Sequence, residues 1–233
     1  EGFFDMFDVV IQLGAILAVL TSFWKKMFPF QFKDKSQPVI KKEIFSLWFK
    51  VVVACIPGAV ITLLFDDYIE TNFHTPIVIA TTLIIYGIGF IIVENWNKMR
   101  TPSIANLNQI TYKTAWLIGL FQVLSIMPGT SRSGATIIGA LIIGVSRVAA
   151  AEFTFFLAVP VMFGLSTLKI LKFGFVFTAS ELFILILGMA VAFIVSVAVI
   201  KFLMSFIKKH DFKAFGCYRI VLGIAVILVT TII

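Results

Sequence analysis

The sequence predicts an all-α integral membrane protein, a polytopic helical bundle, and three observations support this fold class. Hydrophobic residues make up 60% of the 233 residues, and the mean hydropathy is +1.06. Charged residues make up 13%, about half of the roughly 25% found in soluble domains. Several apolar runs are long enough, or nearly so, to cross a hydrocarbon core of about 30 Å as helices. This composition excludes a soluble enzyme, a disordered tail and a secreted disulfide scaffold.

The apolar runs define six expected membrane-spanning helices. They cover residues 9–24, 45–65, 77–93, 153–168, 182–200 and 215–233. The first and fourth runs are short, so they need flanking residues to complete a span. The loops 25–43, 94–113 and 201–214 are rich in lysine and arginine, whereas residues 1–8 and 66–70 are acidic. Basic loops stay in the cytoplasm, so the net charge of +7 reflects topology and indicates no nucleic-acid partner.

The stretch 114–145 does not fit the spanning pattern. Its apolar pieces, 114–127 and 137–145, are each too short to cross a bilayer. A re-entrant helix–loop–helix, which enters and returns to the same side, fits both lengths. The three basic loops share one side only if this stretch does not cross. Both ends of the chain then face outside.

The layout also predicts an inverted-topology repeat. Asp8 and Glu152 each precede an apolar run that begins a set of three spans, and an odd number of spans inverts the second set. The chain is then one membrane domain, 1–233, with first-half helices in 7–93, the second-half re-entrant unit 114–145 and helices in 153–233. The repeat places a first-half re-entrant unit just upstream of residue 1, so we expect that unit to be missing from this sequence.

The most informative segment is the loop of the re-entrant unit. It contains Pro128, Gly129, Thr130, Ser131, Arg132, Ser133, Gly134 and Thr136. Its hydroxyl residues are good N-caps for the following helix, and the free N–H groups of a helix start favour anions. Arg132 adds a planar fork of donors that matches phosphate oxygens. This pattern predicts either a phosphate or diphosphate held within the membrane, or a loop that lines an anion pathway without chemistry.

A resemblance to a known family favours the first alternative. The segment PGTSRSGAT, followed by SRVAAAEFTFFLAVP at 146–160, resembles the second signature of the bacterial undecaprenyl-diphosphate phosphatase family of the bacitracin-resistance type. FDVVIQLGAILAV at 7–19 is similar to the segment after that family's first signature. The resemblance implies hydrolysis of undecaprenyl diphosphate to undecaprenyl phosphate and phosphate, which recycles the lipid carrier of peptidoglycan synthesis. It also implies the bacterial cytoplasmic membrane, a site that faces outside, and a divalent cation (Mg²⁺ or Ca²⁺).

The resemblance assigns site residues position by position. Ser131, Arg132 and Thr136 match the family's catalytic, phosphate-handling positions, and Gly129, Thr130, Ser133 and Gly134 complete the phosphate-binding loop. The family's glutamate-rich first signature, with its Ser/His loop, is not found in this sequence. We therefore expect the metal ligands and the attacking group in the missing upstream segment, and we expect the chain as written to lack activity.

Weaker candidates lie outside the loop. Glu152 is interpreted either as a partner of Arg147 or as a structural carboxylate. Gln12 and Gln122 are polar groups in apolar runs, so each needs a hydrogen-bond partner, and helix–helix hydrogen bonds are the simpler explanation. Arg219 falls near an expected cytoplasmic helix end, where snorkelling explains it.

Two other functions stay open at this stage. Re-entrant loops and inverted repeats are common in transporters, so a transporter or lipid flippase with a phosphate-binding loop is the main alternative. A non-catalytic fragment is the other. A homodimer is also open, and the sequence does not define the metal or the preferred prenyl length.

Overall fold

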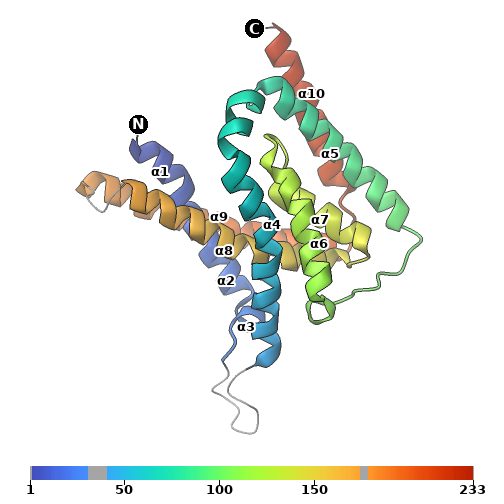
Figure 1. The fold of residues 1–233 in the computed structure, drawn as a ribbon. Helices are drawn as coiled ribbons and strands as arrows, with labels where there is room; N and C mark the ends of the chain where they lie inside the picture. Colours follow the sequence, from blue (N-terminus) through green and yellow to red (C-terminus); the bar gives the residue numbers. More distant parts are fainter. Residues whose placement is uncertain (1, 31–40, 174–177, 233) are drawn as a thin grey trace. The chain divides into compact units, whose positions relative to one another are not determined.

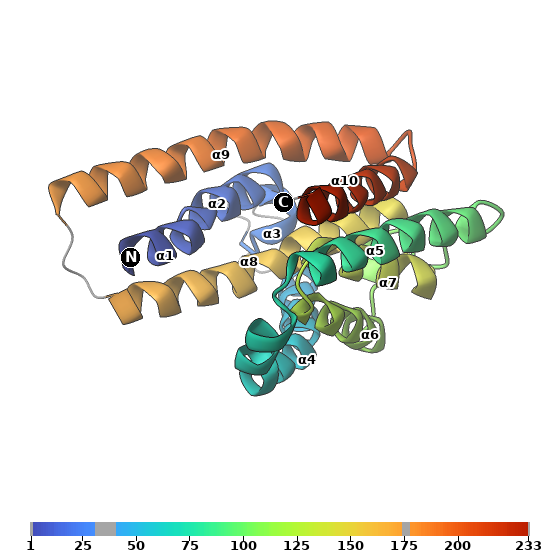
Figure 2. The ribbon, with the colours of Figure 1, turned by 90° about the horizontal axis from the view of Figure 1, so that it is seen from above.

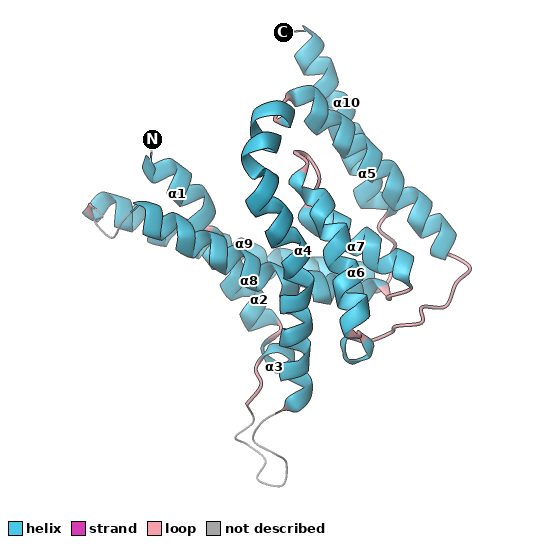
Figure 3. Ribbon diagram, in the orientation of Figure 1, coloured by secondary structure: helices cyan, strands magenta, loops and turns pink. Residues whose placement is uncertain are grey.

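The computed structural model describes residues 2–30, 41–173 and 178–232. These residues are mostly helical and contain no β-strand (Figure 3), which confirms the all-α fold class. Most of the expected basic loop 25–43 and part of the loop after α8 lie outside the described residues. The elements are α1 (Gly2–Val10), α2 (Gln12–Ser22), α3 (Trp24–Met27), α4 (Lys42–Phe73), α5 (Pro76–Asn97), η1 (Leu107–Gln109), α6 (Tyr112–Val123), η2 (Leu124–Ile126), α7 (Arg132–Ile143), α8 (Arg147–Phe173), α9 (Ala179–Ile207) and α10 (Lys213–Ile232).

Five helices are long and apolar enough to cross a membrane: α4, α5, α8, α9 and α10. They contain five of the six expected spans. The first expected span, 9–24, overlaps the apolar stretch Met6–Ser22, which is shorter than the five long helices, so this span stays a prediction. A turn at Ile11 separates α1 from α2 within that stretch.

The chain divides into two compact units. The first contains residues 1–48 and 155–206. Its core at α1 joins Met6 and Val10 to Leu185 of α9. The Trp48 indole donates to the Met27 carbonyl oxygen at 2.9 Å, so the start of α4 is held against the end of α3.

The second unit contains residues 49–154 and 207–233, and it carries the helical hairpin. Helices α5 and α10 lie side by side in it (Figures 1 and 2). A Cβ atom on either Gly87 or Gly216 would lie 2.7 Å from the other residue's carbonyl oxygen. The absence of side chains at this crossing therefore lets the two backbones touch.

Helices α6 and α7 form the hairpin, and each has 12 residues. The segment before α6 pairs with the segment after α7. The Ile104 N–H donates to Gly144 O at 3.1 Å, and the Ser146 N–H donates to Ile104 O at 2.8 Å. Since the chain enters and leaves the hairpin at one place, the geometry is the one a re-entrant unit requires.

The hairpin lies along α5. Its contacts with α5 show how far along that helix the tip of the hairpin extends. The Thr82 hydroxyl of α5 donates to Pro128 O at the tip, at 2.7 Å. The Asn97 amide donates to Leu141 O near the open end, at 3.2 Å. Fifteen residues separate Thr82 and Asn97, about 22 Å along a helix axis. The tip therefore lies near the Pro76 end of α5, six residues or about 9 Å along the helix from it.

Candidate active site

The tip of the hairpin is a helix N-terminus capped by Ser131. The Gly134 N–H donates to Ser131 Oγ at 3.2 Å, and Ser133 Oγ lies 3.0 Å from the same oxygen. This cap starts α7 at Arg132, five residues earlier than the second apolar piece expected from sequence. Ser133, Gly134 and Thr136 therefore belong to the first turns of α7. The cap uses one first-turn donor, and the helix itself cannot satisfy the remaining ones.

Gly129 makes the turn that leads into this cap. Its φ angle is +82°, in the left-handed region that favours glycine. A Cβ atom at this position would also lie 2.6 Å from the Ile79 carbonyl oxygen of α5. Backbone shape and packing both exclude a side chain here, so the path of the loop depends on this residue.

Arg219 of α10 contacts the same glycine. Its Nη2 donates to Gly129 O at 2.8 Å, and its Nε is buried with no hydrogen-bond partner among the described residues. The expectation that Arg219 snorkels at a helix end is therefore wrong, because its head group is turned into the hairpin loop. A charged residue inside an apolar run usually faces a polar site. The position of a charged residue in an apolar run was the only signal in the sequence that could have identified Arg219 as part of this site.

Two further buried polar atoms of the hairpin lack a hydrogen-bond partner within the described part of the chain: Thr130 Oγ1 and Gln122 Oε1. Gln122 lies against Gly58 of α4, where a Cβ atom would be 2.7 Å from its Nε2. Leaving such groups unsatisfied costs about 1–3 kcal/mol each. Together with Arg219 Nε, they fit a site that receives a polar ligand or ordered water.

Thr136 faces away from the tip. It is fully buried, and its hydroxyl lies 3.1 Å from Arg132 O, 3.0 Å from Ser133 O and 3.0 Å from the Thr154 hydroxyl of α8. The structure thus brings Gly129 through Gly134 together at the tip and places Thr136 between the first turn of α7 and α8.

The other supporting candidates are placed differently. Gln12, at the start of α2, donates to Asp8 O of α1, four residues earlier, at 3.2 Å, so its bond is a local one across the turn at Ile11. Glu152 is buried in the second turn of α8.

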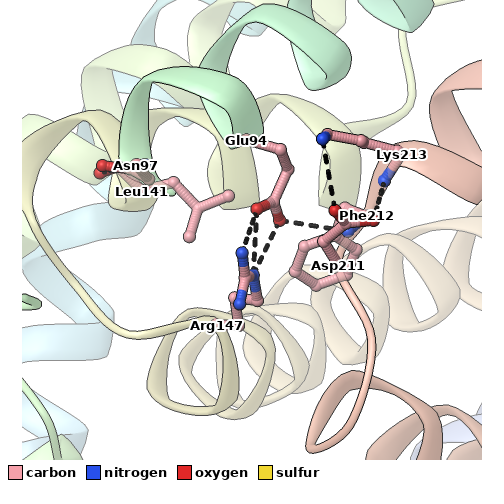
Figure 4. Close-up of polar contacts among 7 residues, drawn as sticks. All are labelled: Glu94, Asn97, Leu141, Arg147, Asp211, Phe212 and Lys213. Carbon is pink, nitrogen blue, oxygen red and sulfur yellow. Dashed lines mark hydrogen bonds and ion pairs between the residues drawn. The ribbon is translucent and has the colours of Figure 1, made fainter. Parts of the chain in front are cut away.

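Arg147 binds Glu94 of α5, as Figure 4 shows. Arg147 Nε lies 3.0 Å and 2.9 Å from the two carboxylate oxygens of Glu94, and the Phe212 N–H donates to one of them at 3.0 Å. Sequence reasoning placed Glu94 in a cytoplasmic loop and considered Glu152 as the partner of Arg147. The placement of Glu94 is wrong because α5 continues to Asn97, which keeps the carboxylate buried.

The expected divalent cation finds no ready site here. Among the described residues, no group of three or more His, Cys, Asp or Glu side chains could hold a metal ion. The described residues therefore do not fit a cation site, and the cation stays a prediction.

Comparisons with known proteins identify the family. The family model for "Bacitracin resistance protein BacA" matches residues 1–225. An undecaprenyl-diphosphatase from Enterococcus faecalis is 69% identical over 232 residues, which cover 100% of this chain and 84% of the relative. Those from Lachnoclostridium phytofermentans and Acetivibrio thermocellus are 62% and 58% identical, over 96% and 98% of this chain and 81% and 83% of the relatives. This chain therefore belongs to the bacitracin resistance protein BacA family.

Proposed function

We propose that this protein is a membrane phosphatase that hydrolyses undecaprenyl diphosphate to undecaprenyl phosphate and phosphate. Relatives that are 58–69% identical carry the name undecaprenyl-diphosphatase. The structural observation that carries the proposal is the tip of the hairpin, where Ser131 caps α7 and Arg132 follows in its first turn. In a chain of this family, such a tip supplies the anion-binding elements that a diphosphate needs.

The chemistry divides between charge neutralisation and positioning. Hydrolysis adds water across the phosphoanhydride, so one P–O bond breaks and one P–O bond to the water oxygen forms. The transferred phosphoryl group carries its charge on several oxygens, and catalysis depends mainly on holding and neutralising them. In this proposal Arg132 binds those oxygens through its paired N–H donors, and the N–H groups at the start of α7 add partial positive charge.

The residues around the tip would position these groups. Arg219 fixes Gly129, and Thr136 anchors the first turn of α7 to α8 through Thr154. Thr130 Oγ1 and Gln122 Oε1 are buried polar atoms without partners among the described residues, so we propose that they bind substrate oxygens or bridging water. Glu152 and Gln12 have no proposed contact with substrate, and a homodimer stays a prediction.

The charge distribution supports an outward-facing site in the cytoplasmic membrane. Lys98 and Arg100 follow α5, whereas Asp66, Asp67 and Glu70 lie near the end of α4, just before α5 begins. Basic ends of helices stay in the cytoplasm, so the Pro76 end of α5 would face outside. The hairpin tip contacts α5 at Thr82, close to that end.

The test is phosphate release by the purified protein from farnesyl or undecaprenyl diphosphate in detergent, with Mg²⁺ or Ca²⁺ and with a chelator. In the full-length protein we expect cation-dependent release of one phosphate for each lipid monophosphate formed. The same protein in vesicles distinguishes the flippase alternative. Transbilayer movement of the lipid without any phosphate release would contradict the proposal and favour a flippase.

A further inference from the structure

A basic pocket lies at the open end of the hairpin, away from the phosphate loop. Its volume is about 860 Å³. It lies where α5 and α7 end and α8 begins, and its lining includes Asn97, Lys98, Arg100, Gly144, Arg147 and Lys208. All of its lining residues are described, and none of them is acidic.

The positive charge in this pocket is poorly compensated by the protein. Of its four cationic side chains, Arg147 is neutralised by the buried carboxylate of Glu94. Arg100 stacks on the Trp96 ring at 3.8 Å, which leaves its charge uncompensated. Lys98 and Lys208 are exposed and take part in no ion pair within the described part of the chain. Three cations therefore face the pocket without a carboxylate.

Helix dipoles do not remove this excess. The C-termini of α5, α7 and α9 each carry about half a negative charge, and the N-terminus of α8 returns about half a positive charge. The remaining dipole charge is about one negative charge, which offsets only one of the three uncompensated cations. The pocket therefore keeps a net positive charge, which favours the binding of an anion from outside the chain.

The position of the pocket indicates the source of that anion. It lies at the ends of two membrane-spanning helices, α5 and α8, which is the level of lipid head groups. Basic pockets between membrane helices bind the head groups of anionic lipids. We propose that this pocket binds the phosphate group of an anionic phospholipid, represented by phosphatidylglycerol. Free phosphate shares that chemistry and is the second source to be distinguished.

Such a ligand would connect elements that form the base of the hairpin. Lys98 follows α5, while Gly144 ends α7 and accepts the hydrogen bonds that join it to Ser103 and Ile104. A phosphate bound between Lys98 and Lys208 would link the segment after α5 to the segment after α9, beside the base of the hairpin. The proposed ligand is thus a structural lipid, separate from the substrate at the tip.

The experiment measures the thermal midpoint of the protein in a neutral detergent as short-chain phosphatidylglycerol is added. Phosphatidylcholine and inorganic phosphate are titrated in parallel, because a ligand that binds the folded state raises the midpoint. The test variant is Lys98→Gln/Lys208→Gln. The matched control, Lys25→Gln/Lys42→Gln, removes the same charge from exposed lysines elsewhere. We expect phosphatidylglycerol to raise the midpoint of the wild type and the control, and to have at least tenfold weaker apparent affinity for the test variant.

A second measurement does not depend on unfolding. Trp96 lies beside the pocket residues Asn97 and Lys98, so a variant with Trp96 as its single tryptophan reports on nearby lipid. Brominated phosphatidylglycerol should quench it more than brominated phosphatidylcholine does, and the difference should vanish in Lys98→Gln/Lys208→Gln. A response to inorganic phosphate alone would assign the pocket to the soluble anion. Equal responses to the two lipids, or an unchanged response in the test variant, would overturn the proposal.

Discussion

Arg219 Nη2 donates to the carbonyl oxygen of Gly129 at 2.8 Å, and the two residues are 90 positions apart in the sequence. The bond joins a membrane-spanning helix, α10, to the turn that starts α7. Gly129 has φ +82°. Glycine exchanges readily between backbone conformations, so a loop without further contacts would not hold this one. Arg219 therefore fixes the backbone that aims the first turn of α7, and with it Arg132.

The first prediction concerns this bond. Arg219→Gln should lower kcat/KM by roughly 10- to 100-fold, because hydrogen bonds from charged groups are worth about 1.5–3 kcal/mol. Phosphate release measured over a range of substrate concentrations separates kcat from KM. A positioning residue should lower kcat more than it raises KM. Lys201→Gln, an exposed change on α9, is the control, and an equal loss in both variants would contradict the role of Arg219.

The second prediction concerns Arg132. Arg132→Lys keeps the positive charge but loses the bidentate fork, so turnover should fall at least about 100-fold, the usual loss for a transition-state donor. The measurement is phosphate release at saturating cation and substrate. Near-wild-type turnover would remove Arg132 from the site. Normal thermal stability of the variant would show that the loss is chemical.

The third prediction concerns Gly129. Gly129→Ala places a Cβ against Ile79 and forces an alanine into the left-handed region, so activity should be nearly lost. Gly164→Ala on α8 is the matched control, because a Cβ there meets nothing within 4 Å. Phosphate release by both purified variants is the measurement. Wild-type activity in Gly129→Ala would show that the loop does not need this turn.

The fourth prediction concerns the ion pair between Glu94 and Arg147. Glu94→Ala removes the charged hydrogen bonds to Arg147, whose side chain is 37% exposed, and leaves the Phe212 N–H without its acceptor, so the free energy of unfolding should fall by about 1.5–3 kcal/mol. Asp211→Asn removes the more exposed pair with Lys213, 3.6 Å apart, and should cost about 1 kcal/mol or less. Unfolding of the purified protein in mixed micelles measures both. Equal losses in the two variants would contradict the burial of Glu94.

The sequence predicted the features that depend on local chemistry. The lengths of the apolar runs located five spanning helices, and the short runs 114–127 and 137–145 indicated the hairpin. The length of an apolar run depends only on residues that are neighbours in the sequence. The hydroxyl residues of the loop were identified as candidate helix caps for the same reason, and Ser131 is the one that forms the cap. The partner of Arg147 and the role of Arg219 could not be predicted, since each depends on which distant helix lies alongside. Glu94 and Gly129 precede their partners by 53 and 90 residues.

The final prediction concerns the side on which the hairpin begins and ends. Single cysteines replace His74, Thr101 or Ser146 in a background where Cys55 and Cys217 are serine. Thr101 precedes the hairpin and Ser146 follows it, and the backbone joins their neighbourhoods through Ile104 and Val145. His74 lies between α4 and α5, beyond the opposite end of α5.

An impermeant maleimide applied to intact cells should label the cysteine at 74, because the charge bias puts that end of α5 outside. The cysteines at 101 and 146 should react only after the membrane is permeabilised. Both should gain labelling under the same condition. Labelling of 101 and 146 from opposite sides would mean that the hairpin crosses the bilayer. Since α6 and α7 have 12 residues each, neither is long enough to do so alone, and the shared accessibility follows from that length.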